Sequence, residues 1–285
     1  MESAWRIHVQ PTWGKKQIGS IRHSEIQKWV SGLAESFSPT VVIRAHNILS
    51  AILEVAVRDR LISTNDAKGI GLPKKNTKRK AYLSFEQVEL LASKSKNYGP
   101  LVLTMAYTGL RWGEVTALRV QDYDASKRRI TVNENAVDVS GKIHVGKPKS
   151  HKSRSVPVAG FLVDMLNEAT QGKQSLQLIF GDGNNYVRQS TSGRGWFAKA
   201  VKLSQSDDET FPRVTPHDLR HTAASLAVSA GANVKAVQRM LGHASAAMTL
   251  DTYADLFDDD LDAVAVGLDE ARSARIVSMS VSMAA

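Results

Sequence analysis

The 285-residue sequence contains no cysteine. Without thiols the chain can have no disulfide framework, no cysteine nucleophile and no cysteine-ligated zinc, and this composition suits a reducing compartment. No apolar run approaches the length of a membrane span, and residues 1–10 lack the apolar core of a secretory signal. Internal repeats and low-complexity segments are also missing from the sequence. We therefore expect a cytoplasmic globular protein with no membrane association.

Acidic residues are outnumbered by basic ones, which gives a formal net charge of +9. Residues 1–81 hold 14 Lys and Arg against 6 Asp and Glu, whereas residues 254–285 hold 7 acidic residues against 2 arginines. A basic surface favours a polyanionic partner, most simply nucleic acid, but it indicates no particular chemistry. The length favours two domains, each able to bury its own core.

The pattern along the chain predicts a mainly α fold with a small antiparallel β-sheet (α+β) in two domains. Two apolar stripes typical of helices run through residues 24–57. The stretch "LPKKNTKRKAY" follows, with a proline and five basic residues, and reads as an exposed linker. We expect a helical domain over residues 1–72, a basic linker over 73–81, a second domain over 82–257 and a C-terminal segment over 258–285.

In the second domain the periodicity changes twice. An apolar helix is expected over residues 101–107, after a helix that begins at Ser84. Three β-branched runs within residues 129–158 predict one three-stranded antiparallel sheet. Helical patterns then return, and they are expected over residues 159–168, 195–203, 216–230, 234–241 and 246–256.

The stretch "PHDLRHTAAS" places two histidines and an arginine at the start of one of these helices. Thr215 can cap the helix, Pro216 fits its first position, and Asp218 completes a capping-box pattern. His217 and Arg220 are three residues apart, so they share a face near a helix N-terminus, where phosphate binds favourably. Taken alone, the stretch is equally compatible with an ordinary solvated first turn.

Further polar residues stand at comparable helix ends. Arg111 lies between two glycines in "TGLRWGE", and Lys149 lies in the turn of "GKPKSHKSRSVP". In "MLGHASAAMTLDTYAD" a glycine ends one helix, His243 follows it, and Tyr253 lies on the next helix. Each motif alone is unspecific, since a helical tyrosine usually belongs to a core.

Five motifs in this order resemble those of the tyrosine recombinases, specifically the phage-type integrases. They are "TGLRWGE", "PKSHKSRSVPV", "HDLRHT", "LGHAS" and "TLDTYAD", and the resemblance spans roughly residues 10–257. It implies a two-domain DNA clamp with a helical core-binding domain and a catalytic domain. The catalytic positions carried over are Arg111, Lys149, His217, Arg220, His243 and Tyr253.

The resemblance implies a reaction that needs neither a metal nor ATP. Tyr253 attacks the scissile phosphate and forms a 3′-phosphotyrosyl bond, which leaves a free 5′-hydroxyl. Arg111 and Arg220 hold the phosphate oxygens through their planar donor forks, and His243 adds a hydrogen bond. Since the bond energy is kept in the intermediate, a second DNA end can displace the tyrosine.

Proton transfer is assigned on the same basis. His217 is expected to assist removal of the proton from Tyr253, and Lys149 to protonate the leaving 5′-oxygen. Lys147 and Lys152 compete for the second role, but Lys149 stands eight residues before the proline that ends the third strand, as in the family.

Other residues receive supporting roles. Glu114 and Asp218 are expected to orient catalytic side chains or to cap helices, and His221 is interpreted as structural because it projects from a different angle. The expected phosphate contacts outside the catalytic set are Lys74, Lys75, Lys78, Arg79, Lys80 and Lys152.

The expected partners follow from the family. They are double-stranded DNA attachment sites in a bacterial host cell, further copies of the chain that form a homotetramer on two sites, and a directionality factor. Without DNA we expect a monomer. Residues 258–279 are expected to dock on a neighbouring protomer and residues 280–285 to form a disordered tail. Against the family pattern, residue 1 comes too late for an arm-binding domain, and the first core-binding helix can be absent as well. A naturally short integrase that works on simple sites and a truncated chain both remain open.

Alternatives remain open at this point. A chromosome-dimer resolvase or a type IB topoisomerase would use the same residues. A non-catalytic helix-turn-helix regulator fits "VSAGANVKAVQRMLGHASAAMTL" but leaves Arg111, Lys149 and Tyr253 unexplained. Metal-dependent hydrolysis through His217 and Asp218 would need further His and Asp pairs at metal-binding spacing.

Overall fold

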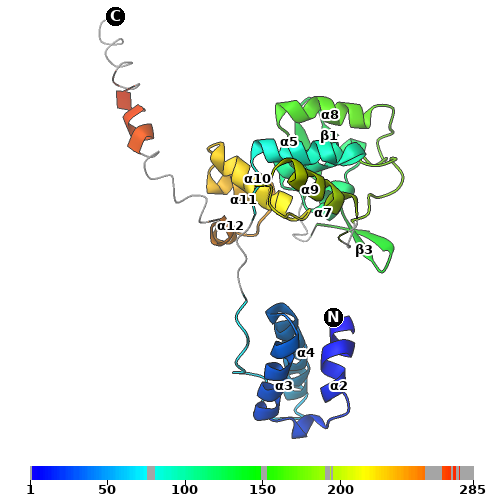
Figure 1. Cartoon of the computed structure of the whole chain (residues 1–285), viewed down its shortest axis with the longest axis vertical. Helices are drawn as coiled ribbons and strands as arrows, with labels where there is room; N and C mark the ends of the chain where they lie inside the picture. Colours follow the sequence, from blue (N-terminus) through cyan, green and yellow to red (C-terminus); the bar gives the residue numbers. More distant parts are fainter. Residues whose placement is uncertain are drawn as a thin grey trace, which may run out of the picture. The chain divides into compact units, whose positions relative to one another are not determined.

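The chain forms two compact units, Met1–Arg79 and Lys80–Ala285. The computed structural model describes residues 2–75, 81–148, 153–189, 193, 195–253, 265–270, 272–273 and 276. Each unit has an apolar core of its own, and helices predominate in both (Figure 1). The expectation of a mainly α fold with a small antiparallel sheet is therefore confirmed.

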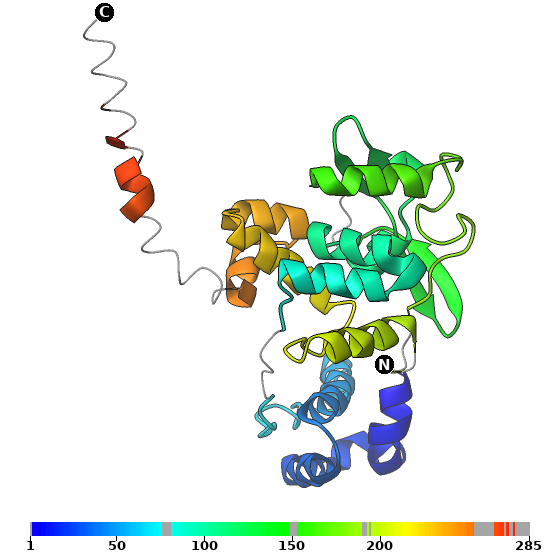
Figure 2. The ribbon, with the colours of Figure 1, turned by 45° about the horizontal axis from the view of Figure 1, so that its top comes forward.

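All the regular elements described in unit 1 are helices. Its elements are α1 (Glu2–Ala4), η1 (Trp5–Val9), α2 (Gln10–Trp13), η2 (Ile18–Ser20), α3 (His23–Ser36) and α4 (Pro39–Arg58). The two predicted apolar stripes correspond to α3, which buries Ile26 and Val30, and α4, which buries Leu49 and Leu53. The helical segment from α1 to α2 was not predicted. It packs on α4 through η1, where Val9 is buried, and Figure 2 shows it alongside the other helices of the unit.

Helix α4 is long and apolar enough, by length and composition, to cross a membrane. The expectation that no run approaches that length was therefore too strong. Part of the apolar character is explained by the core, since Leu49 and Leu53 are at most 2% exposed. The rest lies on the outer face of α4, where Ile52 and Val55 are 38% and 54% exposed.

Unit 2 contains the remaining described elements. Its helices are α5 (Phe85–Lys94), η3 (Lys96–Tyr98), α6 (Gly99–Thr108), α7 (Trp112–Thr116), η4 (Val120–Asp122), α8 (Gly160–Thr170), α9 (Trp196–Asp207), α10 (Asp218–Ser229), α11 (Val234–Leu241) and α12 (Ala246–Tyr253). Its strands are β1 (Tyr123–Asp124), β2 (Arg129–Val132), β3 (Asn135–Val139), β4 (Lys142–Gly146) and β5 (Arg154–Pro157).

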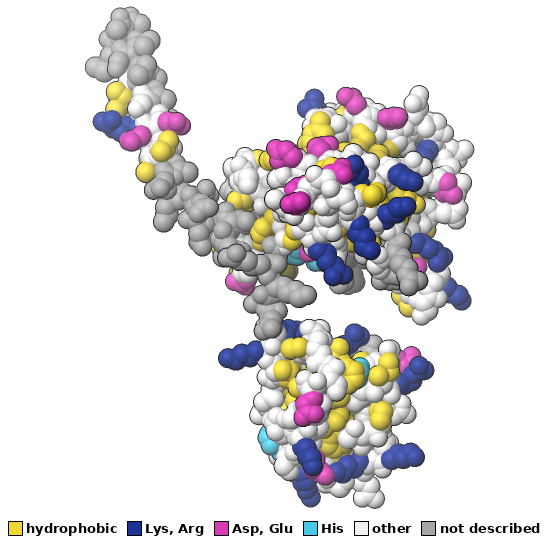
Figure 3. All heavy atoms as spheres, viewed as in Figure 1, with side chains coloured by type: hydrophobic (Ala, Val, Ile, Leu, Met, Phe, Trp, Pro, Cys, Tyr) yellow, Lys and Arg dark blue, Asp and Glu magenta, His cyan; other side chains and the backbone are white. Residues whose placement is uncertain are grey.

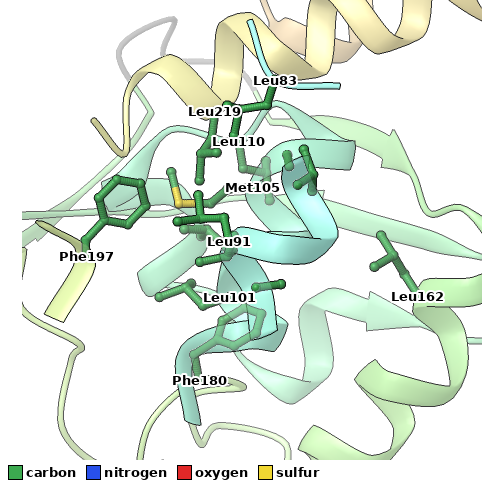
Figure 4. Packing of buried hydrophobic residues seen from close by; sticks show 14 of the residues in the cluster. Leu83, Leu91, Leu101, Met105, Leu110, Leu162, Phe180, Phe197 and Leu219 are labelled. Carbon is green, nitrogen blue, oxygen red and sulfur yellow. The ribbon is translucent and has the colours of Figure 1, made fainter. Parts of the chain in front are cut away.

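The core of unit 2 fixes α10 against α6. Leu91 of α5, Met105 of α6 and Leu219 of α10 are at most 1% exposed. Figure 4 shows these side chains converging with Leu110, while Phe197 approaches from α9. Burial of side chains of this size stabilises the fold by roughly 1.5–3 kcal/mol each relative to exposure. Because α10 carries the HDLRHT motif, this packing determines where the motif lies.

The strands form two sheets, so the prediction of one three-stranded sheet from the three β-branched runs was wrong. β1, β2 and β5 form one antiparallel sheet, and β3 and β4 form a separate hairpin. The first run divides after Val132, and β5 pairs with β2 through Ile130 and Val156. These residues are fully buried, whereas Val137 and Val139 of the hairpin are 46% and 52% exposed. Burial therefore favours the β2–β5 pairing.

The helices expected after the strands are confirmed as α8, α9, α10 and α11, with ends displaced by up to four residues. Helix α11 spans Val234–Leu241 as predicted. Helix α12 begins at Ala246 as predicted, and its predicted end at residue 256 lies outside the described residues.

Candidate active site

Arg220 lies at the centre of the cluster that the motifs predicted. It is only 3% exposed. Its Nη1 donates to the carbonyl of Gly109 at 2.6 Å, and its Nη2 donates to the carbonyl of Leu241 at 2.7 Å. Burial lowers the pKa of Arg220 to about 10, with the charge of Arg111 acting in the same direction. The guanidinium is therefore still protonated at neutral pH, and it joins the C-terminal ends of α6 and α11.

Two glycines allow those helix ends to reach Arg220. Gly109 caps α6 and Gly242 caps α11, and both adopt the left-handed conformation, with φ of 65° and 67°. This conformation is strained for a residue with a Cβ. A Cβ at Gly109 would also collide with the Leu241 side chain, and one at Gly242 would lie 2.8 Å from Cδ of Arg154. Glycine is therefore required at both positions for conformation and for space.

The start of α10 differs in detail from the prediction. The regular helix begins at Asp218 and not at Pro216. The Asp218 carboxylate accepts hydrogen bonds from the backbone N–H and the hydroxyl of Thr215, both at 2.7 Å. Among the described contacts no backbone N–H donates to the hydroxyl of Thr215, so only the half of the predicted capping box that Asp218 supplies is present. Asp218 thus holds the approach to the helix in place.

Arg111 is held by a buried carboxylate. Its Nη1 donates to Oε1 of Glu114 at 2.9 Å, and its backbone N–H donates to Oε2 at 2.9 Å. Arg154 of β5 binds the same carboxylate through two nitrogens, at 2.9 and 2.6 Å. Burial acts to raise the pKa of Glu114, but its bonds to Arg154 and Arg111 outweigh this effect and lower it overall. One carboxylate is therefore shared between two arginines.

Tyr253 is fully buried at the end of α12. Its Oη lies 2.9 Å from Nδ1 of His221, and the two rings meet edge to face. Burial raises the pKa of Tyr253 to about 12, and the positive charge of Arg220 opposes that rise. The tyrosine hydroxyl thus lies within hydrogen-bonding distance of an imidazole that the sequence analysis had interpreted as structural.

The ring of His243 also lies beside that of Tyr253. Its ring is nearly parallel to that of Tyr253, with centroids 6.3 Å apart, and its Nδ1 lies 2.9 Å from the hydroxyl of Thr249. Burial lowers the pKa of His243 to about 4, and the charges of Arg220 and Arg111 act in the same direction. His243 is therefore a neutral imidazole at neutral pH.

His217 is exposed just before α10, and its ring stands edge-on to that of His221, with centroids 5.1 Å apart. The structure thus groups five of the six predicted catalytic residues around the C-terminal ends of α6 and α11. The sixth, Lys149, lies outside the described residues, as does Lys152.

A groove of about 530 Å³ lies between α9 and the approach to α10. Lys202, Arg213 and Thr215 are among its lining residues, and both basic side chains are exposed. Figure 3 shows Lys and Arg side chains of unit 2 gathered on the lower part of that unit in this view, while acidic ones gather above. The groove therefore offers positive charge beside the candidate site.

The basic linker is only partly described. Lys74 and Lys75 are exposed, whereas Lys78, Arg79 and Lys80 lie outside the described residues. Of the C-terminal segment, residues 265–270 are helical, with Val266 and Leu268 exposed by 57% and 67%. The predicted tail over 280–285 lies outside the described residues.

Two residues at the site were missed by the sequence analysis. His221 was interpreted as structural, yet it contacts the hydroxyl of Tyr253. Arg154 received no role, yet it binds Glu114 and also donates from Nε to the carbonyl of Met240 at 3.3 Å. A signal for Arg154 was present, because it stands in the predicted strand "SRSVPV" and an arginine that becomes buried in a strand must find a partner.

Comparison with known proteins identifies the class. The profile of the phage integrase family matches residues 73–259. The chain therefore belongs to this family of tyrosine recombinases.

Individual relatives agree with that assignment. The chain is similar to the transposase from transposon Tn916 of Enterococcus faecalis, with 27% identity over 85% of this chain and 65% of the relative. It is also similar to the integrase of Mycobacterium phage D29, with 26% identity over 86% of this chain and 66% of the relative. The chain thus spans just under two thirds of the length of these relatives.

Solved structures share the fold. The Tn1549 transposon integrase in complex with transposon right end DNA superposes with a TM-score of 0.78 at 24% identity, covering 93% of this chain and 92% of that one. A lambda integrase dimer bound to a COC′ core site gives a TM-score of 0.62 at 18% identity, covering 86% of each chain.

Proposed function

We propose that this chain is a site-specific DNA recombinase of the phage integrase type, which cleaves and rejoins DNA through a 3′-phosphotyrosyl intermediate. The observation that carries the proposal is the surroundings of Tyr253. Its hydroxyl contacts His221, the ring of His243 lies parallel to its own, and the charge of Arg220 acts on its pKa. A phenol among imidazoles and guanidiniums suits attack on a phosphate diester.

The arginines would stabilise the charge that develops on the phosphate. A guanidinium has five N–H donors, so the two backbone bonds of Arg220 leave donors that can bind phosphate oxygens. Arg111 shares its carboxylate partner with Arg154, so its positive charge is only partly compensated. Two fixed cations beside the nucleophile favour the negatively charged transition state.

His243 would complete the binding of the phosphate. At neutral pH its ring is neutral, because its pKa lies near 4. If Nδ1 accepts the hydrogen bond from Thr249, the ring carries its proton on Nε2 and can donate it to a phosphate oxygen. In that tautomer His243 has the donor role that the family resemblance assigns to it.

Protons must leave the tyrosine and reach the departing oxygen. The resemblance assigns the first transfer to His217 and the second to Lys149, which stands on the segment between β4 and β5. A lysine can supply a proton to a 5′-oxygen, whereas an arginine holds its proton too tightly.

The proposed substrate is double-stranded DNA at attachment sites. The matching structures of the Tn1549 integrase and of lambda integrase are complexes with DNA. The exposed Lys74, Lys75, Lys202 and Arg213 offer phosphate contacts in this chain. We also propose assembly as a homotetramer on two DNA sites, with a directionality factor as a further partner, in the cytoplasm of a bacterial host.

Covalent capture tests the function. A duplex with a nick just beyond the scissile phosphate loses the short 5′-hydroxyl fragment after cleavage, so the protein remains attached and migrates more slowly in a denaturing gel. The wild-type chain should form this adduct in the presence of a chelator, and Tyr253→Phe should form none while still binding DNA. Tyr123→Phe, which removes a hydroxyl from β1, is the matched control and should behave as wild type. An adduct of undiminished yield in Tyr253→Phe would contradict the assignment.

A further inference from the structure

The hydroxyl of Tyr253 and the ring of His221 form a close pair inside unit 2. Nδ1 of His221 lies 2.9 Å from Oη of Tyr253, on neighbouring helices α10 and α12. We propose that His221 is a catalytic residue, the general base that accepts the proton of Tyr253 when the tyrosine attacks DNA. This inference rests on the function proposed above and assigns to His221 the role that the resemblance gives to His217.

The tyrosine needs an acceptor because of where it lies. Its side chain is fully buried, and that burial raises its pKa to about 12. The phenol therefore stays protonated at neutral pH, and attack on phosphorus requires the proton to leave as the bond forms. A general base must lie within about 2.6–3.2 Å of the proton-bearing atom, and Nδ1 of His221 meets that requirement.

The other two imidazoles differ from His221 in their contacts. His243 already places Nδ1 on the hydroxyl of Thr249, and its pKa near 4 makes it a weak base. His217 is exposed, and its ring edge contacts the ring of His221. His221 is half-buried and contacts the reacting oxygen itself. This arrangement favours His221 as the first proton acceptor and leaves His217 beside it, nearer the solvent.

The step balances as written. The O–H bond of Tyr253 breaks while its Oη forms a bond to phosphorus, and the proton moves to Nδ1 of His221 in the tautomer that carries its own proton on Nε2. The phosphorus bond to the 5′-oxygen breaks, and that oxygen takes a proton from Lys149. In rejoining, the 5′-hydroxyl attacks phosphorus and returns its proton to Lys149, while the imidazolium of His221 returns a proton to Tyr253.

Two substitutions separate proton transfer from the holding of the hydroxyl. In His221→Asn the side-chain amide stands near the position of Nδ1, so it can still hydrogen-bond to Oη but cannot accept a proton at neutral pH. His221→Gln is the matched variant, because its amide reaches the position of Nε2 instead. We expect both to form the covalent adduct at least about 100-fold more slowly than wild type, the scale of a lost general base. If His221 only held the hydroxyl of Tyr253 in place, His221→Asn would form the adduct at the wild-type rate.

A more acidic nucleophile gives the decisive measurement. Replacing Tyr253 with 3,5-difluorotyrosine lowers the pKa of the phenol with little change in shape, so the reaction depends less on a base. The rate ratio between the wild-type and His221→Asn proteins should shrink at least about 10-fold in the fluorinated background. A DNA substrate with sulfur in place of the leaving 5′-oxygen should restore Lys149→Ala but not His221→Asn, because a thiolate leaves without a proton.

The outcomes are distinguishable. If the wild-type protein forms no adduct, the proposed function fails. If it does form the adduct and His221→Asn reacts at the wild-type rate, or the fluorinated tyrosine leaves the rate ratio unchanged, only the assignment of His221 fails. If His217→Asn shows the fluorotyrosine rescue and His221→Asn does not, the general base is His217. Thermal unfolding and DNA binding of each variant, measured alongside, establish that the adduct rates compare folded proteins.

Discussion

The two arginines assigned to the phosphate have opposite surroundings. Arg220 is 3% exposed and donates to two backbone carbonyls, whereas the side chain of Arg111 is 29% exposed and pairs with the carboxylate of Glu114. Carbonyls at helix C-termini carry only partial negative charge, while a carboxylate carries a full one. The charge of Arg220 is therefore not compensated by its partners, whereas Glu114 would compensate the charge of Arg111 in full if no other cation shared that carboxylate.

Arg154 is the cation that shares the carboxylate. It binds both oxygens of Glu114, so two guanidiniums share one carboxylate and the trio keeps a net positive charge. Arg154 also reaches the carbonyl of Met240 in α11, the helix whose last carbonyl holds Arg220. The comparison shows two ways to hold a cation in the candidate site: backbone carbonyls at one arginine, and a shared carboxylate at the other.

The largest effect is expected at Arg220. Arg220→Ala leaves the carbonyls of Gly109 and Leu241 without their donors, so the free energy of unfolding should fall by about 3 kcal/mol. Arg220→Lys keeps the charge but cannot bind both carbonyls in the same geometry. It should therefore form little covalent adduct. Chemical denaturation and the nicked-substrate assay measure the two effects. Arg239→Ala, on the exposed side of α11, is the control. A fully stable Arg220→Ala would show that the carbonyls do not depend on the guanidinium.

A smaller and non-additive effect is expected at the shared carboxylate. Arg154→Met leaves Glu114 paired with Arg111 alone, so the cation for phosphate is neutralised and adduct formation should fall about 10-fold or more. Adding Glu114→Gln removes the carboxylate charge, and the double variant should regain part of the lost rate. The single variant should also lose about 3 kcal/mol of unfolding free energy, because a buried charge loses a partner. A strictly additive double-mutant cycle would contradict charge sharing.

The pKa of His243 is sensitive to the charges of both arginines. Burial is the first cause of its low value, near 4, followed by the charge of Arg220 and then that of Arg111. Arg220→Gln should therefore raise the pKa of His243 more than Arg111→Gln does, as measured by NMR titration of the imidazole. The opposite order would mean that Arg111 has the stronger field at the site.

The same shift has a consequence for stability. The unfolded chain binds a proton at His243 near pH 6.5, whereas the folded chain binds it only near pH 4. The unfolded state therefore holds more protons in this window, and the contribution of His243 to stability is lost as pH falls from about 6.5 to about 4. As the pH falls from about 6.5 to about 4, the melting temperature of the wild type should therefore fall more than that of His243→Asn. A constant difference would show that His243 titrates alike in both states.

The sequence predicted the helices of the site well because local signals determine them. Gly109 and Gly242 end helices, and apolar periodicity defines α10 and α11. The five ordered motifs identify Arg111, Arg220 and Tyr253 as candidate catalytic residues. The misplaced strand pairing has a physical cause. Which β-branched run pairs with which depends on burial against helices remote in the sequence, and Ile130 and Val156 are buried where Val137 is not.

The contacts of His221 and Arg154 could not be predicted for a related reason. His221 was judged from its angle on its own helix, but its partner Tyr253 lies 32 residues away on α12. Arg154 finds its carboxylate 40 residues away in α7. Such contacts depend on how helices cross, which periodicity within one helix does not reveal.

The smallest effects are expected at exposed cations that are held neither by backbone carbonyls, as Arg220 is, nor by the shared carboxylate of Glu114. Lys202 and Arg213 line the groove beside the start of α10 and are exposed, as are Lys74 and Lys75 in the linker. If they contact DNA phosphates, replacing each with glutamine should reduce the slope of log affinity against log salt by about one unit, with a similar loss for every DNA sequence. Lys127→Gln is the control, since Lys127 pairs with Asp124 at 3.0 Å in the β1–β2 turn. Adduct formation at saturating protein should change little, because these cations attract DNA without touching the reacting phosphate. A salt slope equal to wild type in the Lys202 and Arg213 variants would show that these two exposed cations do not contact DNA phosphates.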